Sequence, residues 1–206
     1  MELYLVRHGE TEWSRARRHT GRTDVPLSPA GEAEALALGA HLDGLEVDRV
    51  LASPLDRATT TARLAGFGER LETTRALLEF DYGDYEGLTT PQIRADRPGW
   101  DLFRDGCPGG ETAAAVAERA CRLVAELAGG DGRVMLFGHG HQLRILTACY
   151  LGLPPDAARH LFLGTASVSV LGREHDWPAV LLWNEQEGSG ASRHEAGVPG
   201  WRGISG

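Results

Sequence analysis

The sequence lacks a hydrophobic run long enough to cross a membrane, and it contains little cysteine. Its first apolar run, Leu3 to Val6, is shorter than the hydrophobic core of a signal peptide, so we expect neither membrane insertion nor secretion. The three cysteines, Cys107, Cys121 and Cys149, lie far apart, and an odd number does not suggest a disulfide framework. These absences predict a protein of the reducing cytoplasm.

An excess of positive charge is also missing. The 29 acidic residues outnumber the 21 lysines and arginines and give a formal net charge of −8. A protein that binds nucleic acid or a membrane surface usually needs a basic face, so we expect neither partner. An anionic ligand would have to be bound by a local cluster of cations. The sequence carries no signal for an oligomeric state.

The chain is long enough for one substantial core, with 206 residues of which 42% are hydrophobic. We predict a single domain over residues 1–187 and a loose, Gly- and Ser-rich tail over 188–206. Strand-like and helix-like segments alternate along the domain, and strands are expected at 3–6, 49–52, 71–75, 133–137, 167–171 and 179–183. This alternation is typical of a three-layer α/β protein (αβα), in which helices cover both faces of a mostly parallel sheet.

Two Ser-Pro pairs predict where helices begin. Serine suits the N-cap and proline the first helical position, so we expect helices from Ser28-Pro29 to Leu42 and from Ser53-Pro54 to about Gly66. The second start places Arg57 in or near the first turn of its helix, directly after a strand. A helix N-terminus offers unpaired N–H groups, and a guanidinium beside it favours an anion.

Three predicted strands end in residues that can do chemistry, namely Arg7-His8, the segment from Ser53 to Arg57, and Gly138-His139. In a mostly parallel sheet these carboxyl ends lie along one edge, which is where open α/β folds bind their ligands. Two arginines and two histidines would then meet in one pocket. Arginine forks match the oxygens of phosphate, so the sequence predicts a site for a small phosphorylated ligand. The region at about 82–110 is expected to form a small excursion that covers this site.

Arg7-His8-Gly9-Glu10-Thr11, together with Arg57, Glu79 and Gly138-His139-Gly140 at these separations, resembles the histidine phosphatase superfamily, which includes phosphoglycerate mutases. The resemblance covers the chain from Leu3 to about Trp183 and implies a phosphoglycerate mutase-like fold. Four further stretches, at 19–27, 81–87, 109–112 and 138–141, are most similar to small broad-specificity acid phosphatases and to sedoheptulose bisphosphatase-type sugar phosphatases.

The resemblance implies a role for each of five residues. His8 is the expected nucleophile, which forms a phosphohistidine and must be neutral to attack. Arg7, Arg57 and His139 are expected to hold the phosphate oxygens, so that neither a metal nor another cofactor is needed. Glu79 is the expected general acid, which protonates the leaving group and then activates water. The expected activity is hydrolysis of a phosphate monoester, with a small phosphorylated metabolite as substrate.

Five other residues are candidate contacts to the phosphate or to the rest of the substrate. Thr20 and Gly21 either offer backbone N–H groups to the phosphate or form a plain turn. Ser14 stands where family members usually have Asn, so a hydroxyl replaces an amide donor. Gly140 belongs to the motif around the second histidine, and His141 either contacts the substrate or caps the helix that follows.

Three alternatives remain open beside the phosphatase. A phosphoglycerate mutase would use the same site, but mutases carry a basic run after the acid, whereas Phe80-Asp81-Tyr82 follows Glu79 here. A metal hydrolase could be built on His139-Gly140-His141 with Asp81 or Asp84, although the arginines would then repel the metal. A phosphoprotein-binding relative with an inactive site is the third. The sequence does not identify the substrate.

Overall fold

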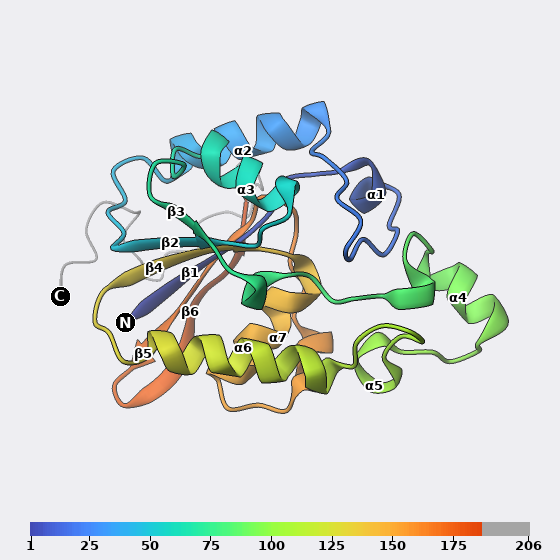
Figure 1. Cartoon of the computed structure of the whole chain (residues 1–206). Helices are drawn as coiled ribbons and strands as arrows, with labels where there is room; N and C mark the ends of the chain where they lie inside the picture. Colours follow the sequence, from blue (N-terminus) through green and yellow to red (C-terminus); the bar gives the residue numbers. More distant parts are fainter. Residues whose placement is uncertain (187–206) are drawn as a thin grey trace, which may run out of the picture.

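A six-stranded sheet forms the middle of the molecule in the computed structural model, which describes residues 1–186 (Figure 1). The strands are β1 (Glu2–Arg7), β2 (Arg49–Ala52), β3 (Leu71–Thr73), β4 (Arg133–Gly138), β5 (Val168–Glu174) and β6 (Trp177–Glu185). Their order in the sheet is β3-β2-β4-β1-β5-β6. The first four strands in this order run parallel to one another, and β5 pairs antiparallel with β1 on one side and with β6 on the other. The predicted tail at 188–206 lies outside the described residues.

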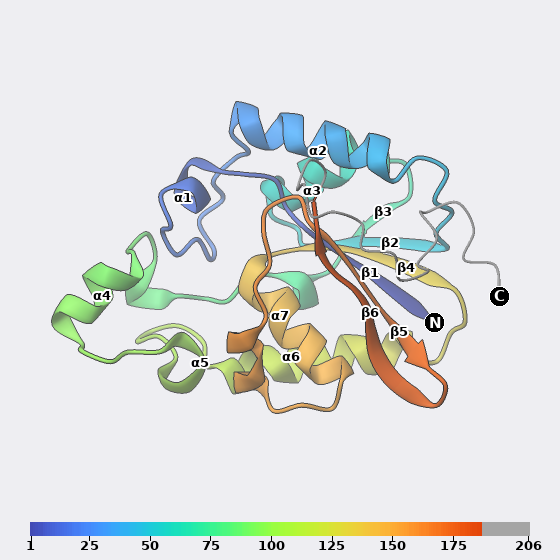
Figure 2. The same cartoon turned by 180° about the vertical axis from the view of Figure 1, so that it is seen from behind.

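Helices cover both faces of the sheet, as predicted (Figures 1 and 2). On one face lie α2 (Pro29–His41) and α3 (Asp56–Leu64), and on the other lie α6 (Ala113–Leu127) and α7 (Gly140–Tyr150). The three-layer αβα architecture with a mostly parallel sheet is confirmed. Within residues 1–186, no helix is both long enough and apolar enough to pass through a bilayer.

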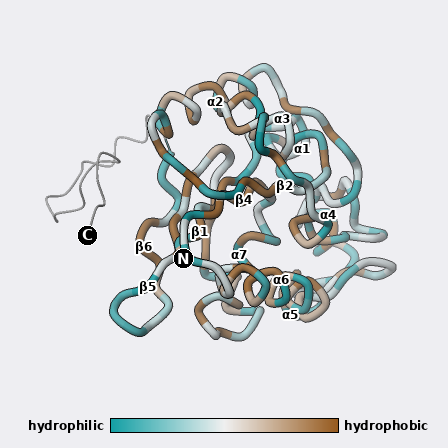
Figure 3. Tube along the Cα trace, turned by 60° about the vertical axis from the view of Figure 1, so that its left-hand side comes forward, coloured by the Kyte–Doolittle hydropathy of each residue, from teal (hydrophilic) through white to brown (hydrophobic). Residues whose placement is uncertain are grey.

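The core is divided by the sheet into two halves. Successive side chains of a strand point to opposite faces, so Leu3 and Leu5 of β1 pack towards α6 and α7, whereas Tyr4 and Val6 pack towards α2 and α3. All four side chains are buried. The short apolar run that opens the sequence is therefore a central strand with both faces covered. Figure 3 shows the hydrophobic stretches on the central elements and the hydrophilic turn between β5 and β6.

The remaining helices are short and lie mostly beyond the carboxyl ends of the parallel strands (Figures 1 and 2). They are α1 (Glu12–Arg15), α4 (Thr90–Asp96), α5 (Leu102–Asp105) and the 3-10 turns at Arg75–Leu77, Gly83–Tyr85 and Pro155–His160. The excursion at about 82–110 is tied to the loop after α1, because His19 N donates to Leu88 O at 2.8 Å and Gly87 N to His19 O at 2.8 Å. It therefore borders the end of the sheet where the site is expected.

One of the two predicted helix starts is confirmed and the other is wrong by two residues. Ser28 caps α2, and its hydroxyl accepts from Gly31 N at 3.1 Å. The helix after β2 begins at Asp56 instead of after Ser53-Pro54. Its first N–H group donates to the carboxylate of Asp24, at 2.9 and 3.1 Å, so a distant loop supplies the cap. Arg57 still lies in the first turn.

The cysteines differ from the prediction. Cys121 of α6 and Cys149 of α7 form a disulfide that closes a sequence separation of 28 residues, and Cys107 is a buried free thiol. The odd number of cysteines and the absence of a CxxC pattern gave no indication of this pair. The two helices are neighbours on one face of the sheet, and that proximity becomes visible only once the fold is known.

Candidate active site

The three strand ends that were expected to meet are neighbours in the sheet. Arg7 at the end of β1 is in register with Gly138 at the end of β4, and Ala52 of β2 pairs with Phe137. Beyond these ends opens a cavity of about 750 Å³. Its lining includes Arg7, His8, Ser14, Thr20, Glu79, Gly140 and His141, seven of the residues proposed from the sequence. Arg57 and His139 lie behind this lining.

His8 is buried and oriented by the backbone. Its side chain has 5% relative exposure, and Nδ1 lies 2.7 Å from Gly9 O. A carbonyl oxygen only accepts, so Nδ1 carries the proton and Nε2 keeps its lone pair. Burial, together with the positive charges of Arg57 and Arg7, lowers the pKa of His8 well below its usual range. The imidazole is therefore neutral and has the tautomer that a nucleophilic Nε2 requires.

Arg57 is fully buried, and its guanidinium donates four hydrogen bonds to other groups of the protein. Its Nε donates to Nδ1 of His139 at 3.2 Å. Its two terminal nitrogens donate to the carbonyl oxygens of Thr20, Gly21 and Thr23 at 2.9 to 3.1 Å. Arg57 thus holds His139 on one side and the loop at 20–23 on the other, and it places a positive charge beside His8.

Two buried nitrogens around His8 have no hydrogen-bond partner within the described part of the chain, namely Nε of Arg7 and Nε2 of His139. Burial and the positive charges of Arg57 and Arg7 lower the pKa of His139 well below its usual range. Nδ1 of the neutral ring accepts from Arg57, so Nε2 carries the hydrogen. The rings of His8 and His139 are 5.1 Å apart. Unpaired buried donors are costly, and the oxygens of a bound phosphate are acceptors of the kind that both donors lack.

Glu79 is buried, and the N-terminus of α7 holds its carboxylate. Oε1 accepts from Gln142 N at 2.9 Å and from Phe80 N at 2.8 Å, while Oε2 accepts from His141 N at 3.1 Å. The residues beside Glu79 in the sequence, Leu77, Leu78 and Phe80, have apolar side chains and give no sign of these donors. The fold instead supplies three N–H groups and the positive end of a helix dipole.

Arg119 of α6 fixes the segment that carries Glu79. Its terminal nitrogens donate to the carbonyl oxygens of Ala76, Leu78 and Glu79 at 2.9, 2.6 and 3.1 Å. Two further bonds, each 3.2 Å, join it to the carboxylate of Glu111. No sequence pattern singles out Arg119, because it lies in the middle of an amphipathic helix and nothing local distinguishes it from a solvated arginine.

Three of the five secondary candidates already have partners. The hydroxyl of Ser14 donates to Thr11 O at 3.0 Å and accepts from Thr11 N at 2.9 Å, in the capping box of α1. Gly21 N donates to a carboxylate oxygen of Glu86 at 2.8 Å, which favours the plain turn of the two alternatives left open for Thr20 and Gly21. The carbonyl oxygen of Thr20 accepts a hydrogen bond from Arg57 at 3.1 Å.

The other two candidates lie at the start of α7. A Cβ at Gly140 would lie 3.4 Å from Nε of Arg7, so this glycine keeps the arginine accessible. Nδ1 of His141 lies 2.6 Å from the hydroxyl of Tyr82, and burial lowers the pKa of the imidazole and raises that of the phenol. Tyr82 therefore donates to a neutral His141. His19, whose pKa burial lowers to about 4, packs on Tyr82 with ring centroids 4.8 Å apart.

The histidines at 139 and 141 do not converge with acids. Among residues 1–186, no group of three or more His, Cys, Asp or Glu side chains is placed to hold a metal ion. Nδ1 of His139 faces Arg57 and Nδ1 of His141 faces Tyr82. The donor set that a metal hydrolase would need at these two histidines is not assembled in the described chain.

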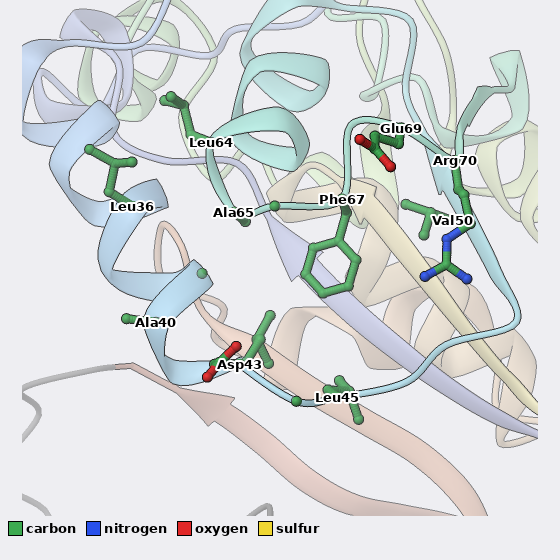
Figure 4. Close-up of a pocket in the computed structure, with 14 residues that line it drawn as sticks. Leu36, Ala40, Asp43, Leu45, Val50, Leu64, Ala65, Phe67, Glu69 and Arg70 are labelled. Atoms are coloured by element: carbon green, nitrogen blue, oxygen red, sulfur yellow. The ribbon is translucent and has the colours of Figure 1, made fainter.

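A second cavity, of about 420 Å³, lies between α2, α3 and β2 (Figure 4). Figure 4 shows Leu45, Val50 and Phe67 on its walls, with Asp43 and Arg70 among the polar residues that line it. It contains none of the residues proposed from the sequence, so the chemistry is assigned to the larger cavity.

Comparison with known proteins gives one consistent family. The family model described as histidine phosphatase superfamily (branch 1) matches residues 3–186. An acid phosphatase from Mycobacterium tuberculosis is 44% identical over 177 residues, covering 84% of this chain and 87% of that protein. A sedoheptulose 1,7-bisphosphatase from Saccharomyces cerevisiae is 34% identical over 182 residues, covering 72% of this chain and 67% of that protein.

Two further similarities bear on activity and fold. A probable phosphoglycerate mutase, GpmB, from Salmonella choleraesuis is 33% identical over 191 residues, covering 87% of this chain and 88% of that protein. The solved structure of the Mycobacterium tuberculosis open reading frame Rv3214 superposes with a TM-score of 0.86 at 39% identity, covering 90% of this chain and 97% of that one.

Proposed function

Since the chain belongs to the histidine phosphatase superfamily (branch 1) and is a phosphatase of that family, we propose that it hydrolyses sugar phosphates or similar small metabolite esters through His8. The observation that carries this proposal is the state of His8. It is neutral, it is held by Gly9 O, and it lies beside two unpaired buried donors.

The first step is transfer of the phosphoryl group to His8. Nε2 forms a bond to phosphorus as the bond to the ester oxygen breaks, and Glu79 gives the leaving alkoxide its proton. Glu79 must carry a proton at the start of this step. The three N–H groups that contact it then stabilise the carboxylate that forms when the proton has been given up. In the second step, water attacks phosphorus, Glu79 takes its proton, and the N–P bond breaks.

Charge on the transferring group is neutralised by the protein's own cations. Nε of Arg7 and Nε2 of the neutral His139 are buried donors without a partner within residues 1–186, so they are free to contact its oxygens, and Arg57 adds a second positive charge from behind His139. Phosphoryl transfer leaves the protein mainly positioning and electrostatic stabilisation to perform. We assign both tasks to these residues, so removal of divalent metal with EDTA is expected to leave activity unchanged.

Trapping of the intermediate tests the proposal. After incubation with a ³²P-labelled phosphate ester and an alkaline quench, the chain should carry a label that is stable in alkali and lost in acid. His8→Ala should carry no label, whereas His160→Gln, which changes an exposed histidine outside the cavity, should be labelled like the wild type. An alkali-stable label on His8→Ala would falsify the assignment.

Mutase activity is the second candidate, because a relative is named a probable phosphoglycerate mutase. The sequence opposes it, because Phe80-Asp81-Tyr82 follows Glu79 in place of the basic run that mutases carry after the acid. Incubation with 3-phosphoglycerate separates the two activities. We expect release of inorganic phosphate to exceed formation of the 2-phospho isomer, and the reverse result would favour the mutase.

The location and partners expected from the sequence remain proposals. We propose a cytoplasmic enzyme whose partner is its phosphorylated substrate, with neither nucleic acid nor membrane bound. The disulfide between Cys121 and Cys149 removes the cysteine pattern as a reason for a reducing compartment, so this proposal depends on the remaining sequence features. Fractionation of cells and a gel-shift assay would test these two points.

A further inference from the structure

Three arginines at the outer end of the catalytic cavity have no part in the proposed chemistry. Arg15, Arg17 and Arg18, here called the mouth arginines, line the same cavity as His8 but are exposed to solvent. Within residues 1–186, none of their guanidinium groups has a hydrogen-bond or ion-pair partner. Three unpaired cations within four consecutive residues are unexpected in a chain whose net charge is −8. Their charge is therefore available to a ligand.

The other arginines of this cavity are already held by the protein. Nη1 of Arg7 donates to Leu163 O at 2.6 Å. Arg144 donates through Nε to Ala158 O at 2.9 Å and through Nη2 to Arg159 O at 3.2 Å. The mouth arginines therefore differ from Arg7 and Arg144, whose guanidinium groups already donate to backbone carbonyl oxygens.

The backbone presents the mouth arginines in a fixed turn. Arg17 has φ +54°, in the left-handed region that residues with a side chain rarely adopt. The turn is secured because Arg17 N donates to Ser14 O at 3.0 Å and Arg18 N to Trp13 O at 2.9 Å. Strained backbone of this kind persists where the surroundings impose it and is a pointer to function.

Apart from its arginines, the cavity is lined by engaged carboxylates and by neutral side chains. Two carboxylates of the described chain line the cavity, and both are engaged. Glu79 accepts from α7, and Glu10 accepts from the hydroxyl of Ser28 at 2.7 Å. The wall also includes the neutral side chains of Phe162 and Thr165. Negative charge on a ligand is therefore favoured at two places, the floor at His8 and the mouth.

We propose that the mouth arginines form a subsite for a second anionic group, a carboxylate or a phosphate, on a substrate whose scissile phosphate lies at His8. This rests on the proposed function and narrows it. The preferred substrates are small phosphate monoesters that carry an anion at each end. A monoester without the second anion is bound through the floor of the cavity alone.

The test compares three substrates with one variant. p-Nitrophenyl phosphate has no second anion, 3-phosphoglycerate adds a carboxylate, and fructose 1,6-bisphosphate adds a phosphate. In the triple variant Arg15→Gln, Arg17→Asn, Arg18→Gln, asparagine keeps the left-handed turn. We expect KM to rise on the order of tenfold for at least one doubly anionic substrate and to change less than about twofold for p-nitrophenyl phosphate. The substrate with the larger rise identifies the preferred anion.

Arg122→Gln is the matched control, because Arg122 is an exposed arginine of α6 outside the cavity, and it should change none of the three values. An equal loss on all three substrates, or no loss on any, would overturn the proposal. Calorimetry separates the subsite from the catalytic function. The doubly anionic compounds should bind His8→Ala more tightly than the same variant without the mouth arginines, whether or not the wild type turns them over. Equal binding would also overturn the subsite.

Discussion

Replacing Arg119 tests how the catalytic acid is positioned. Arg119→Met keeps the aliphatic stem and removes the three bonds to the carbonyl oxygens of the segment before and at Glu79, together with the ion pair to Glu111. Loss of one partner from a largely buried ion pair costs about 3–5 kcal/mol. We expect the free energy of unfolding to fall by about this amount and the segment that carries Glu79 to loosen.

The catalytic effect of Arg119→Met should depend on the leaving group. An alkyl phosphate needs a proton from Glu79 as its ester bond breaks, whereas p-nitrophenolate leaves without one. We therefore expect kcat/KM to fall roughly tenfold or more for glycerol phosphate and less than about threefold for p-nitrophenyl phosphate, where a well-placed acid contributes 10²–10⁴-fold in all. The assay is steady-state release of phosphate at a temperature where circular dichroism shows the variant folded.

Two comparisons make this prediction decisive. Glu79→Gln gives the full contribution of the acid, and combining it with Arg119→Met should add little, because both changes act on one group. Arg122→Met, on the same helix, removes only an exposed arginine that pairs with Glu118 at 3.5 Å, so it should leave kcat/KM unchanged for both substrates. Equal losses of Arg119→Met on both substrates would refute a positioning role and leave only a structural one.

Three other changes have outcomes that follow from single features. Arg57→Ala removes a buried charge and the bonds to the loop at 20–23, and should lower kcat/KM on the order of 10²-fold or more in steady-state assays. Burial lowers the pKa of His19 from 6.5 to about 4, so the unfolded chain binds more protons between these values. Stability is therefore lost as the pH falls through this window, by on the order of 3 kcal/mol from His19 alone, which urea unfolding at several pH values would measure. Cys149→Ser opens the disulfide to Cys121 and should lower the free energy of unfolding by about 2–4 kcal/mol in the same assay, and no loss would contradict the pairing.

The secondary structure could be predicted where short-range patterns determine it. The apolar run after Arg49 gives β2 with its predicted bounds, and Ser28 before a proline caps α2. The same pattern failed at Ser53-Pro54, because the N-terminus of α3 takes its cap from Asp24, which lies 32 residues earlier. A local pattern predicts an element reliably only when no distant group offers a better partner.

The candidate site divides in the same way. Residue types and strand ends were sufficient to bring Arg7, His8 and His139 together, because a parallel sheet places its carboxyl ends side by side. The contacts that orient them come from far along the chain. Leu163 O holds Arg7, and Arg119 holds the segment of Glu79. Such partners are chosen by the tertiary fold, so no pattern around the catalytic residues could have indicated them.

The two arginines that looked equivalent in sequence differ in what they can offer a phosphate. Arg57 gives hydrogen bonds to His139 and to three carbonyl oxygens, so it contributes mainly its charge and the orientation of that histidine. Arg7 keeps a buried Nε–H without a partner in the described chain, as His139 does at Nε2. Phosphate oxygens would give these two donors the acceptors that they lack. To bind Arg57, by contrast, a phosphate oxygen would have to replace a carbonyl oxygen of the loop at 20–23. We therefore infer that Arg7 and His139 contact the phosphate directly. Arg57 acts through the electrostatic field of its positive charge and through its hydrogen bond to His139.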